Sequence, residues 1–407
     1  LAAATFDYNV NAGSNEVTEV TTIVADQINV GEQLTVTNIL KTGSAIPTLK
    51  WDNEASSTAG TFAATFRDST VSGDTEVKLV LDDVKALNSD ATTGRFNLGT
   101  GANASVETLR VVSQGTTANT LNASSSNNDG TAVDLVGAST DGSNDNGALK
   151  TVIVEGAQAF GKAAELVTDT TEANYGLMNR TTNGTNDLGA TTKATAANLV
   201  SLAATVTTLD ASAATGDTNI RFTGRVDGAE VAVTYKGGKA NDYVEFQQGN
   251  VNATGGDGND TFAFVNAQNN STLTTADTIV GGAGTDTIQM GVNGVGSYNL
   301  ETTEFNNKSG IDVLDMRGLI NTVKLSDSFV TGSDAGLTVR TDKIVQTSAT
   351  SSANDSVNKA NNFIEDQTTN TIDLTALAAN RAVTVTGGSG SDRLLVNEVA
   401  LNSSIVF

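Results

Sequence analysis

Short segments in which apolar and polar residues alternate run along the chain, and they predict β-strands. Four of them lie near the N-terminus: Thr18–Val24, Gln33–Ile39, Thr61–Phe66 and Asp74–Leu81. A period of two places one face of a strand in the core and the other in solvent. We therefore predict that residues 1–98 form an N-terminal β-sandwich-like domain, with Trp51 in a loop after Pro47.

Beyond residue 99 the apolar segments shorten, and linkers rich in Ser, Thr, Asn and Gly separate them. Recurring apolar triplets lie in Val106–Val111, Leu149–Val154 and Ile311–Met316. Short strands divided by turn residues are typical of the rungs of a β-solenoid. We predict a β-solenoid-like region over 99–230 with a helical excursion at Ala157–Leu166, and a second helical segment at Asn354–Asp366.

One longer phrase occurs twice. Thr208–Ala213 and Thr371–Ala376 each contain an aspartate and lead into an alternating strand that ends at a glycine. The interval from the aspartate to that glycine is the same in both copies (224 − 210 = 387 − 373). The shared interval indicates a duplicated structural unit.

A nine-residue phrase, Gly-Gly-x-Gly-x-Asp-x-U-x with U apolar, marks the C-terminal half. Complete copies begin at Gly255, Gly281 and Gly387, and a fourth copy at Gly237 has Ala240 in place of the third glycine. Glycine adopts positive φ without steric cost, so such a loop can turn its carbonyl oxygens inward. Carbonyl and carboxylate oxygens suit Ca²⁺, which takes about six to eight of them. The candidate calcium-binding residues are Gly238, Asp242, Gly256, Asp257, Gly258, Asp260, Gly282, Gly284, Asp286, Gly388, Gly390 and Asp392.

These phrases resemble the RTX nonapeptide repeats of secreted bacterial proteins. The resemblance implies a parallel β-roll in which two nonapeptides form one turn, with Ca²⁺ between adjacent loops. Two copies start two nonapeptide lengths apart (255 − 237), so Asp242 and Asp260 would share an edge of neighbouring turns. The next copy starts one position short of three nonapeptide lengths later (281 − 255) and needs a slip or an inserted loop. We predict a calcium-binding RTX-like β-roll or solenoid over 231–407; glycine-rich turns without metal are the alternative.

Charge and composition narrow the function. The chain has 46 acidic and 23 basic residues, a formal net charge of −23, and neither Cys nor His. The acidity argues against nucleic acid as a partner and favours the uptake of cations. The missing residues exclude disulfides, imidazole-bound zinc and Ser-His-Asp catalysis. We predict a protein that is not an enzyme, has no transmembrane segment, and carries the Asp82-Asp83 pair in a solvated turn.

The dispersed copies in a chain rich in Thr, Ser and Ala, together with the phrase Leu209–Asp217, resemble bacterial surface-layer (S-layer) proteins with RTX-type repeats. The resemblance implies a secreted, extracellular structural protein that assembles with itself in a calcium-dependent lattice on the bacterial cell surface, with surface polysaccharide as a further partner. An alternative is a calcium-dependent RTX-type adhesin or a carbohydrate- or ice-binding module, which needs a regular array of Thr or aromatic residues. A third alternative, which the missing His disfavours, is a secreted polysaccharide-modifying enzyme.

Overall fold

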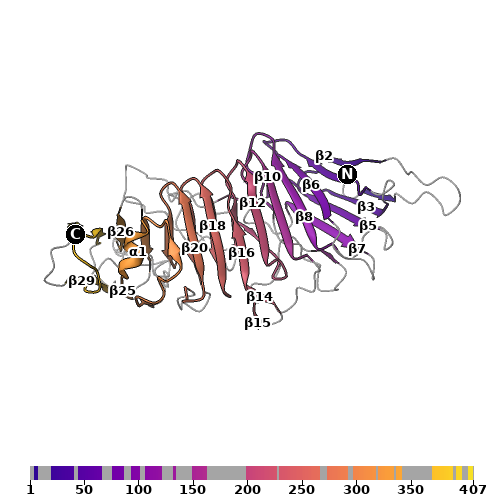
Figure 1. The fold of residues 1–407 in the computed structure, drawn as a ribbon. Coiled ribbons are helices and arrows are strands. Elements are labelled where there is room, and N and C mark those ends of the chain that lie inside the picture. Colours follow the sequence, from indigo (N-terminus) through magenta and orange to yellow (C-terminus); the bar gives the residue numbers. More distant parts are fainter. Residues whose placement is uncertain are drawn as a thin grey trace, which may run out of the picture. The chain divides into compact units, whose positions relative to one another are not determined.

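A computed structural model of the chain describes part of its residues, and every structural statement below concerns that part (Figure 1). The described residues are 4–7, 20–40, 45–66, 76–86, 93–100, 106–121, 132–133, 149–162, 199–226, 229–265, 273–291, 297–317, 320–333, 336–341, 369–387, 391–396 and 402–406. The chain divides into two compact units, here unit 1 (Leu1–Ala163 and Asn198–Asp242) and unit 2 (Ala164–Ala197 and Tyr243–Phe407). The predicted mainly β class is confirmed, with several parallel sheets.

The strands of unit 1 fall into two main sheets. One has the order β1 (Ala4–Asp7), β3 (Gln33–Ile39), β5 (Thr61–Phe66), β7 (Arg95–Thr100) and β9 (Ala132–Val133). The other contains, in order, β2 (Thr22–Asp26), β4 (Thr48–Asp52), β6 (Glu76–Asp82), β8 (Thr108–Gln114), β10 (Thr151–Gly156), β12 (Thr208–Ala214) and β16 (Val233–Lys236). Two short pairs complete the unit: β11 (Val200–Ser201) with β13 (Asn219–Phe222), and β14 (Arg225–Val226) with β15 (Ala229–Glu230).

Consecutive strands of the N-terminal part alternate between the two sheets, and within each sheet they pair in parallel. Leu49 pairs with Leu79, and Val77 pairs with Leu109, so each rung places an apolar residue over the next. Immunoglobulin-type sandwiches pair their strands antiparallel instead. Among the described strands of unit 1 only β7–β9 and β14–β15 are antiparallel.

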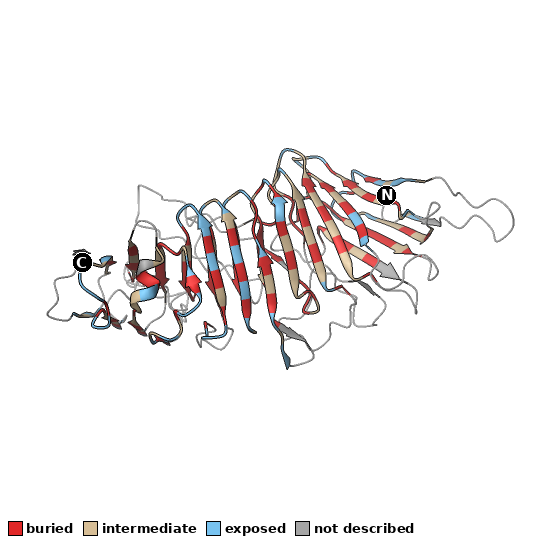
Figure 2. Ribbon diagram, in the orientation of Figure 1, coloured by how far each residue is buried: buried red, intermediate tan, exposed pale blue. Residues whose placement is uncertain are grey.

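Burial follows the predicted period of two. The pattern along β8 alternates intermediate and buried residues, and Figure 2 shows buried residues (red) alternating with more exposed ones along neighbouring strands of this sheet. The loop predicted for Trp51 is wrong, because this residue lies in β4 and is fully buried. Its ring centroid lies 6.0 Å from that of Phe62, which in turn lies 5.7 Å from that of Phe96. Aromatic side chains on successive rungs thus fill the core.

Unit 2 contains three parallel sets of strands. The first has the order β18 (Val251–Asp257), β20 (Thr278–Ala283) and β23 (Lys308–Ser309). The second has the order β17 (Tyr243–Phe246), β19 (Thr261–Phe264), β21 (Thr287–Met290), β24 (Val313–Met316), β26 (Leu337–Arg340), β28 (Ala382–Thr386) and β30 (Asn402–Val406). The third has the order β22 (Ser297–Leu300), β25 (Ile320–Lys324), β27 (Thr369–Asp373) and β29 (Ser391–Leu395).

The apolar position of the nine-residue phrase faces inward where it was expected to. Phe262 and Ile288 are fully buried and lie opposite each other on β19 and β21. Leu394, in the third complete copy, is only partly buried on β29.

One α-helix occurs among the described residues, and the sequence pattern did not predict it. Helix α1 (Asp327–Thr331) begins after Ser326, whose hydroxyl accepts a hydrogen bond from the N–H of Phe329. The helix predicted at Ala157–Leu166 is wrong for its described part, since residues 157–162 form bends and bridges. The segment Asn354–Asp366 lies outside the described residues.

The two copies of the duplicated phrase share one local hydrogen-bond pattern. In unit 1, Asp210 Oδ1 accepts hydrogen bonds from the N–H and hydroxyl of Ser212 at 3.0 and 2.6 Å. In unit 2, Asp373 Oδ1 accepts from the N–H and hydroxyl of Thr375 at 2.8 and 2.5 Å. An aspartate that binds the backbone two residues on favours a local bend. The chain then differs between the copies, because β12 continues to Ala214 whereas β27 ends at Asp373.

Candidate metal centre

Three buried aspartates of unit 2 are linked by hydrogen bonds, each from the backbone N–H of one aspartate to the carboxylate of the aspartate on the next rung. The N–H of Asp260 donates to Asp286 Oδ1 at 2.9 Å, and the N–H of Asp286 donates to Asp312 Oδ2 at 3.0 Å. Their exposed fractions are 1%, 0% and 9%. We call Asp260, Asp286 and Asp312 the aspartate ladder. Its successive members are equally spaced along the chain (286 − 260 = 312 − 286).

Asp312 was missed from sequence, although a signal for it exists. A glycine precedes each ladder aspartate by two positions, at Gly258, Gly284 and Gly310, and all three glycines have positive φ. The strands that follow stay in register, with Thr261 opposite Thr287. Asp312 does not belong to a complete nine-residue phrase. It does belong to a Gly-x-Asp tripeptide, Gly310–Asp312, at the same interval from Asp286 as Asp286 is from Asp260. This interval predicts the ladder better than the nine-residue phrase does, because it equals the number of residues between paired positions on successive strands.

The double glycines of the phrase leave room for oxygen atoms. A Cβ at Gly281 would come well under 3.0 Å from both Asp286 Oδ2 and the carbonyl oxygen of Gly310. A Cβ at Gly255 would meet Asp260 Oδ2 and the carbonyl oxygen of Gly281 in the same way. In each case a carboxylate oxygen and a carbonyl oxygen converge on space that only glycine leaves free.

The carboxylate of Asp286 is buried beside a second carboxylate and receives one backbone donor. Burial raises its pKa to about 6, the nearby Asp312 adds to the rise, and the N–H of Asp260 opposes it. Asp286 Oδ2 is buried and has no hydrogen-bond partner among the described residues. Asp312 differs, since its Oδ1 accepts from the Ser333 hydroxyl at 2.9 Å. A bound cation would stabilise a buried carboxylate oxygen that has no hydrogen-bond donor.

The other candidate residues of these two copies lie around the ladder. Gly256 and Gly282 are opposite each other on β18 and β20, both with positive φ. A Cβ at Gly282 would meet the carbonyl oxygen of Gly256, and one at Gly284 would meet that of Gly258. Asp257, at the end of β18, is exposed. These glycines therefore permit close stacking of successive rungs.

Asp242 lies in unit 1 and is fully engaged by the protein. Its carboxylate accepts from the N–H of Thr218 at 2.6 Å, the hydroxyl of Tyr235 at 2.6 Å and the N–H of Gly238 at 3.1 Å. It is 1% exposed, and burial raises its pKa to about 6, against the three donors. The predicted role of Asp242 as a calcium ligand is not tested by this geometry, and the three donors satisfy its carboxylate without a metal ion.

The third copy lies on a different sheet of unit 2 from the ladder. Asp392 belongs to β29, and its Oδ1 accepts from Asn370 Nδ2 at 2.6 Å, while Asn370 Oδ1 accepts from Asn321 Nδ2 at 2.6 Å. Gly388 and Gly390 lie outside the described residues. The structure therefore brings Asp260 and Asp286 together and leaves Asp392 in a separate row of amide side chains.

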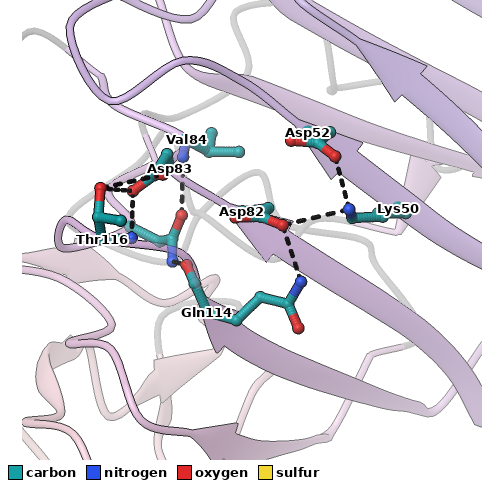
Figure 3. Close-up of polar contacts among 8 residues, drawn as sticks. Lys50, Asp52, Asp82, Asp83, Val84, Gln114 and Thr116 are labelled. Carbon is teal, nitrogen blue, oxygen red and sulfur yellow. Dashed lines mark hydrogen bonds and ion pairs between the residues drawn. The ribbon is translucent and has the colours of Figure 1, made fainter.

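The solvated turn predicted for Asp82-Asp83 is wrong. Asp83 is 9% exposed and accepts from the N–H groups of Thr116 and Thr117, each at 2.7 Å. Burial acts to raise the pKa of Asp83, but these backbone donors lower it overall. Asp82 accepts from Lys50 Nζ at 3.1 Å and from Gln114 Nε2 at 2.8 Å (Figure 3). The pair joins neighbouring rungs and is saturated with donors, so it has a structural role.

Unit 2 also contains a buried lysine. Lys308 is 5% exposed, and its ammonium donates to the carbonyl oxygens of Thr274 and Asp277 at 2.7 and 2.8 Å. Burial lowers its pKa to about 8, opposed by the charges of Asp277 and Glu304. At this position the Lys308 ammonium, rather than a metal ion, is the cation that the carbonyl oxygens contact.

In three comparisons, no protein-family model, no curated protein and no solved structure matches the chain. The described residues contain no group of three or more His, Cys, Asp or Glu side chains arranged to hold a metal ion. No helix in the described part of the chain has the length and hydropathy needed to span a membrane.

Proposed function

We propose that the chain is a calcium-binding β-solenoid that assembles with itself in the extracellular space, as the subunit of a bacterial surface layer. The register of the parallel strands β17, β19 and β21 supports the solenoid part of this proposal. Tyr243 pairs with Thr261, two nonapeptide lengths further along the chain (261 − 243), which is the length expected for one RTX-type turn. Thr261 pairs with Thr287 after a longer interval (287 − 261), so an insertion lengthens that rung without breaking the parallel pairing.

Asp286 Oδ2 carries the calcium proposal. Leaving a buried acceptor without a donor costs about 1–3 kcal/mol, and more when the group is charged. A Ca²⁺ ion held by Asp286 Oδ2 and the carbonyl oxygen of Gly310 would remove that cost. Asp260 and Gly281 offer the same pair of oxygens one rung earlier. Calcium binds carbonyl oxygens and water as readily as carboxylates, so such a site does not require three acidic side chains.

Calcium titration of the full chain tests this part of the proposal. In calcium at about 100 times its Kd, the wild type should gain about 2.7 kcal/mol of unfolding free energy over the chelated protein. Asp286→Asn keeps an oxygen that can accept from the Asp260 N–H but removes the charge, so it should lose calcium affinity by calorimetry. Asp82→Asn, which removes a carboxylate charge of unit 1 outside the nine-residue phrases, is the control and should bind as the wild type does. Absence of calcium binding by the wild type would refute the metal site.

Net charge links calcium to assembly. A formal charge of −23 on a 41.6 kDa chain opposes close packing of identical copies. Sodium chloride only screens charge, over about 8 Å at physiological ionic strength, whereas bound Ca²⁺ neutralises it locally. Extracellular calcium modules bind at roughly 10⁻⁴–10⁻³ M, so the metal would be bound mainly outside the cell. An acidic surface that takes up calcium is the property expected of an extracellular lattice subunit.

Light scattering and negative-stain microscopy test the assembly. We expect ordered sheets in millimolar calcium, dispersal by a chelator, and no rescue by sodium chloride at the same ionic strength. Sheets that persist after prolonged chelation, or that form equally well in sodium alone, would remove calcium as the assembly switch.

A row of threonines on unit 1 favours the adhesin or carbohydrate- or ice-binding alternative as a second candidate. Four partly buried threonines lie in register on adjacent strands: Thr108, Thr151, Thr208 and Thr234. The next outward row is uneven, since it holds Arg110, Ile153, Asp210 and Lys236. Loss of ice-growth inhibition or polysaccharide co-sedimentation in Thr151→Val would support this candidate; the surface-layer proposal expects neither activity.

A further inference from the structure

The sheet of unit 1 that begins with β2 has an edge there. Among the described strands, β2 pairs only with β4. The carbonyl of Thr21 accepts from the N–H of Thr48 at 2.9 Å, and the N–H of Gln27 donates to the carbonyl of Asp52 at 2.8 Å. Successive residues of a parallel strand direct their backbone groups to opposite sides. The N–H and C=O of Val24 therefore point away from β4, toward the open edge.

The last sheet of unit 2 ends in a similar edge at β29. This strand pairs with β27, and the carbonyl of Leu395 accepts from the N–H of Leu374 at 2.8 Å. By the same alternation, the backbone groups of Leu394 and Val396 point away from β27. An edge with open donors and acceptors is a template for another strand.

Exposed apolar side chains accompany both edges. Val24 and Val30, in and beside β2, are 51% and 52% exposed, and Val396, directly after β29, is 54% exposed. These are three of the five large hydrophobic residues exposed in the described part of the chain. Asp26 on β2 and Arg393 on β29 are also exposed and carry opposite charges. In a parallel pairing Val24 and Asp26 would align with odd-numbered residues of β29, such as Arg393 and Leu395, and Val396 would lie on the other face. The two edges therefore match in backbone and charge.

We propose that β29 of one copy of the chain pairs in parallel with β2 of a second copy. The partner is the chain itself, because the same polypeptide carries both complementary edges. The contact is heterologous, so a pair of copies keeps one open β2 edge and one open β29 edge and can add a further copy at either. This inference rests on the proposed self-assembly and names the surface through which it occurs.

The variant Val24→Pro tests the contact in the full chain. Proline removes an N–H that faces the open edge, and an edge strand tolerates it there because no hydrogen bond to β4 is lost. Losing about 1.4 kcal/mol per contact should raise the protein concentration needed for assembly in calcium about tenfold. Val24→Thr retains the N–H and should assemble at nearly the wild-type concentration. Equal assembly of the proline variant and the wild type would overturn the proposal.

Cross-linking identifies the two edges directly, because the chain has no native cysteine. Val24→Cys and Leu395→Cys proteins, whose cysteines would lie on the same face of the joined sheet, are mixed in calcium and treated with a short bis-maleimide. We expect dimers that contain one copy of each variant, no dimers with either variant alone, and fewer dimers when Asp26→Pro is added to the Val24→Cys protein. Calcium-dependent sheets without mixed dimers would refute this contact and leave the self-assembly intact. Absence of both sheets and mixed dimers would refute both.

Discussion

Asp242 in unit 1 and Asp286 in unit 2 occupy the same position of the same sequence phrase, yet their surroundings differ. Both are buried, and burial raises the pKa of each to about 6. Asp242 receives two N–H donors and the hydroxyl of Tyr235. Asp286 receives one N–H donor, and its second oxygen has no hydrogen-bond partner among the described residues. One aspartate is compensated by protein donors on both oxygens, whereas the other has a carboxylate oxygen without a donor among the described residues.

The Arg110 ion pairs of unit 1 and the Lys308 ammonium of unit 2 are stabilised in different ways. On the outward face of unit 1, partly exposed ion pairs join neighbouring rungs, as where Arg110 bridges Glu76 and Glu155. In unit 2 the ammonium of Lys308 is buried among carbonyl oxygens. Exposed charges are stabilised by solvent, whereas buried ones depend on specific partners. Substitutions that remove such partners should therefore affect the two units unequally.

The largest expected effect comes from the close stacking of rungs in unit 2. Gly282→Ala would place a Cβ against the carbonyl oxygen of Gly256 in a backbone with φ of 123°. Because both the neighbour and the φ are unfavourable, the free energy of unfolding should fall by more than about 4 kcal/mol. Gly31→Ala in unit 1 is the control: its φ is 79°, but nothing lies within 4 Å of the added Cβ. It should cost only about 1–2 kcal/mol. Similar losses in urea denaturation would contradict the stacking argument.

Lys308→Met should change how stability depends on pH. The folded-state pKa, about 8, lies below the ordinary value of 10.5, so the unfolded chain binds the proton more tightly. The contribution of Lys308 to the free energy of unfolding should therefore rise as pH increases from about 8 to 10.5, by about 3 kcal/mol at most. The variant lacks this rise. Denaturation curves of wild type and variant at pH 7.5 and 10 measure the difference, and parallel pH profiles would contradict a buried ammonium.

Tyr235→Phe tests the compensation of Asp242. The tyrosine hydroxyl donates to Asp242 Oδ2 at 2.6 Å, and both residues are 1% exposed. Losing a hydrogen bond to a charged group should cost about 2 kcal/mol of unfolding free energy. Calcium affinity should stay unchanged, because this carboxylate is stabilised by protein donors. A fall in the measured calcium stoichiometry would instead make Asp242 a ligand, and the contrast with Asp286 would disappear.

The smallest effect should come from the exposed charges of unit 1. Lys236 Nζ lies 3.3 Å from Asp210 Oδ2, and the two side chains are 56% and 31% exposed. Lys236→Met should therefore change the free energy of unfolding by less than about 1 kcal/mol. Asp210 keeps its hydrogen bonds to Ser212 in the variant. A loss comparable with that of Tyr235→Phe would show that the outward charges of unit 1 matter as much as its buried ones.

Local pattern predicted several elements well. The bounds of β3 and β5 agree with the predicted Gln33–Ile39 and Thr61–Phe66, because alternation and β-branched residues act within one strand. Trp51 was misplaced because β4 is short and follows the only proline, a local turn signal that core packing overrode. Helix α1 was missed because so short a segment shows no helical period.

The sequence by itself determined the strand-rich class, the glycine turns and the aspartates at their ends, since backbone preference and side-chain alternation are local properties. Only the tertiary structure decided which groups meet. The threonines of unit 1 have no regular interval along the chain (151 − 108, 208 − 151 and 234 − 208 all differ), yet they form one row. Their rungs differ in length, whereas hydrogen bonding keeps neighbouring strands in register. The donors of Asp242 and the uncompensated oxygen of Asp286 likewise depend on which backbone lies one rung away.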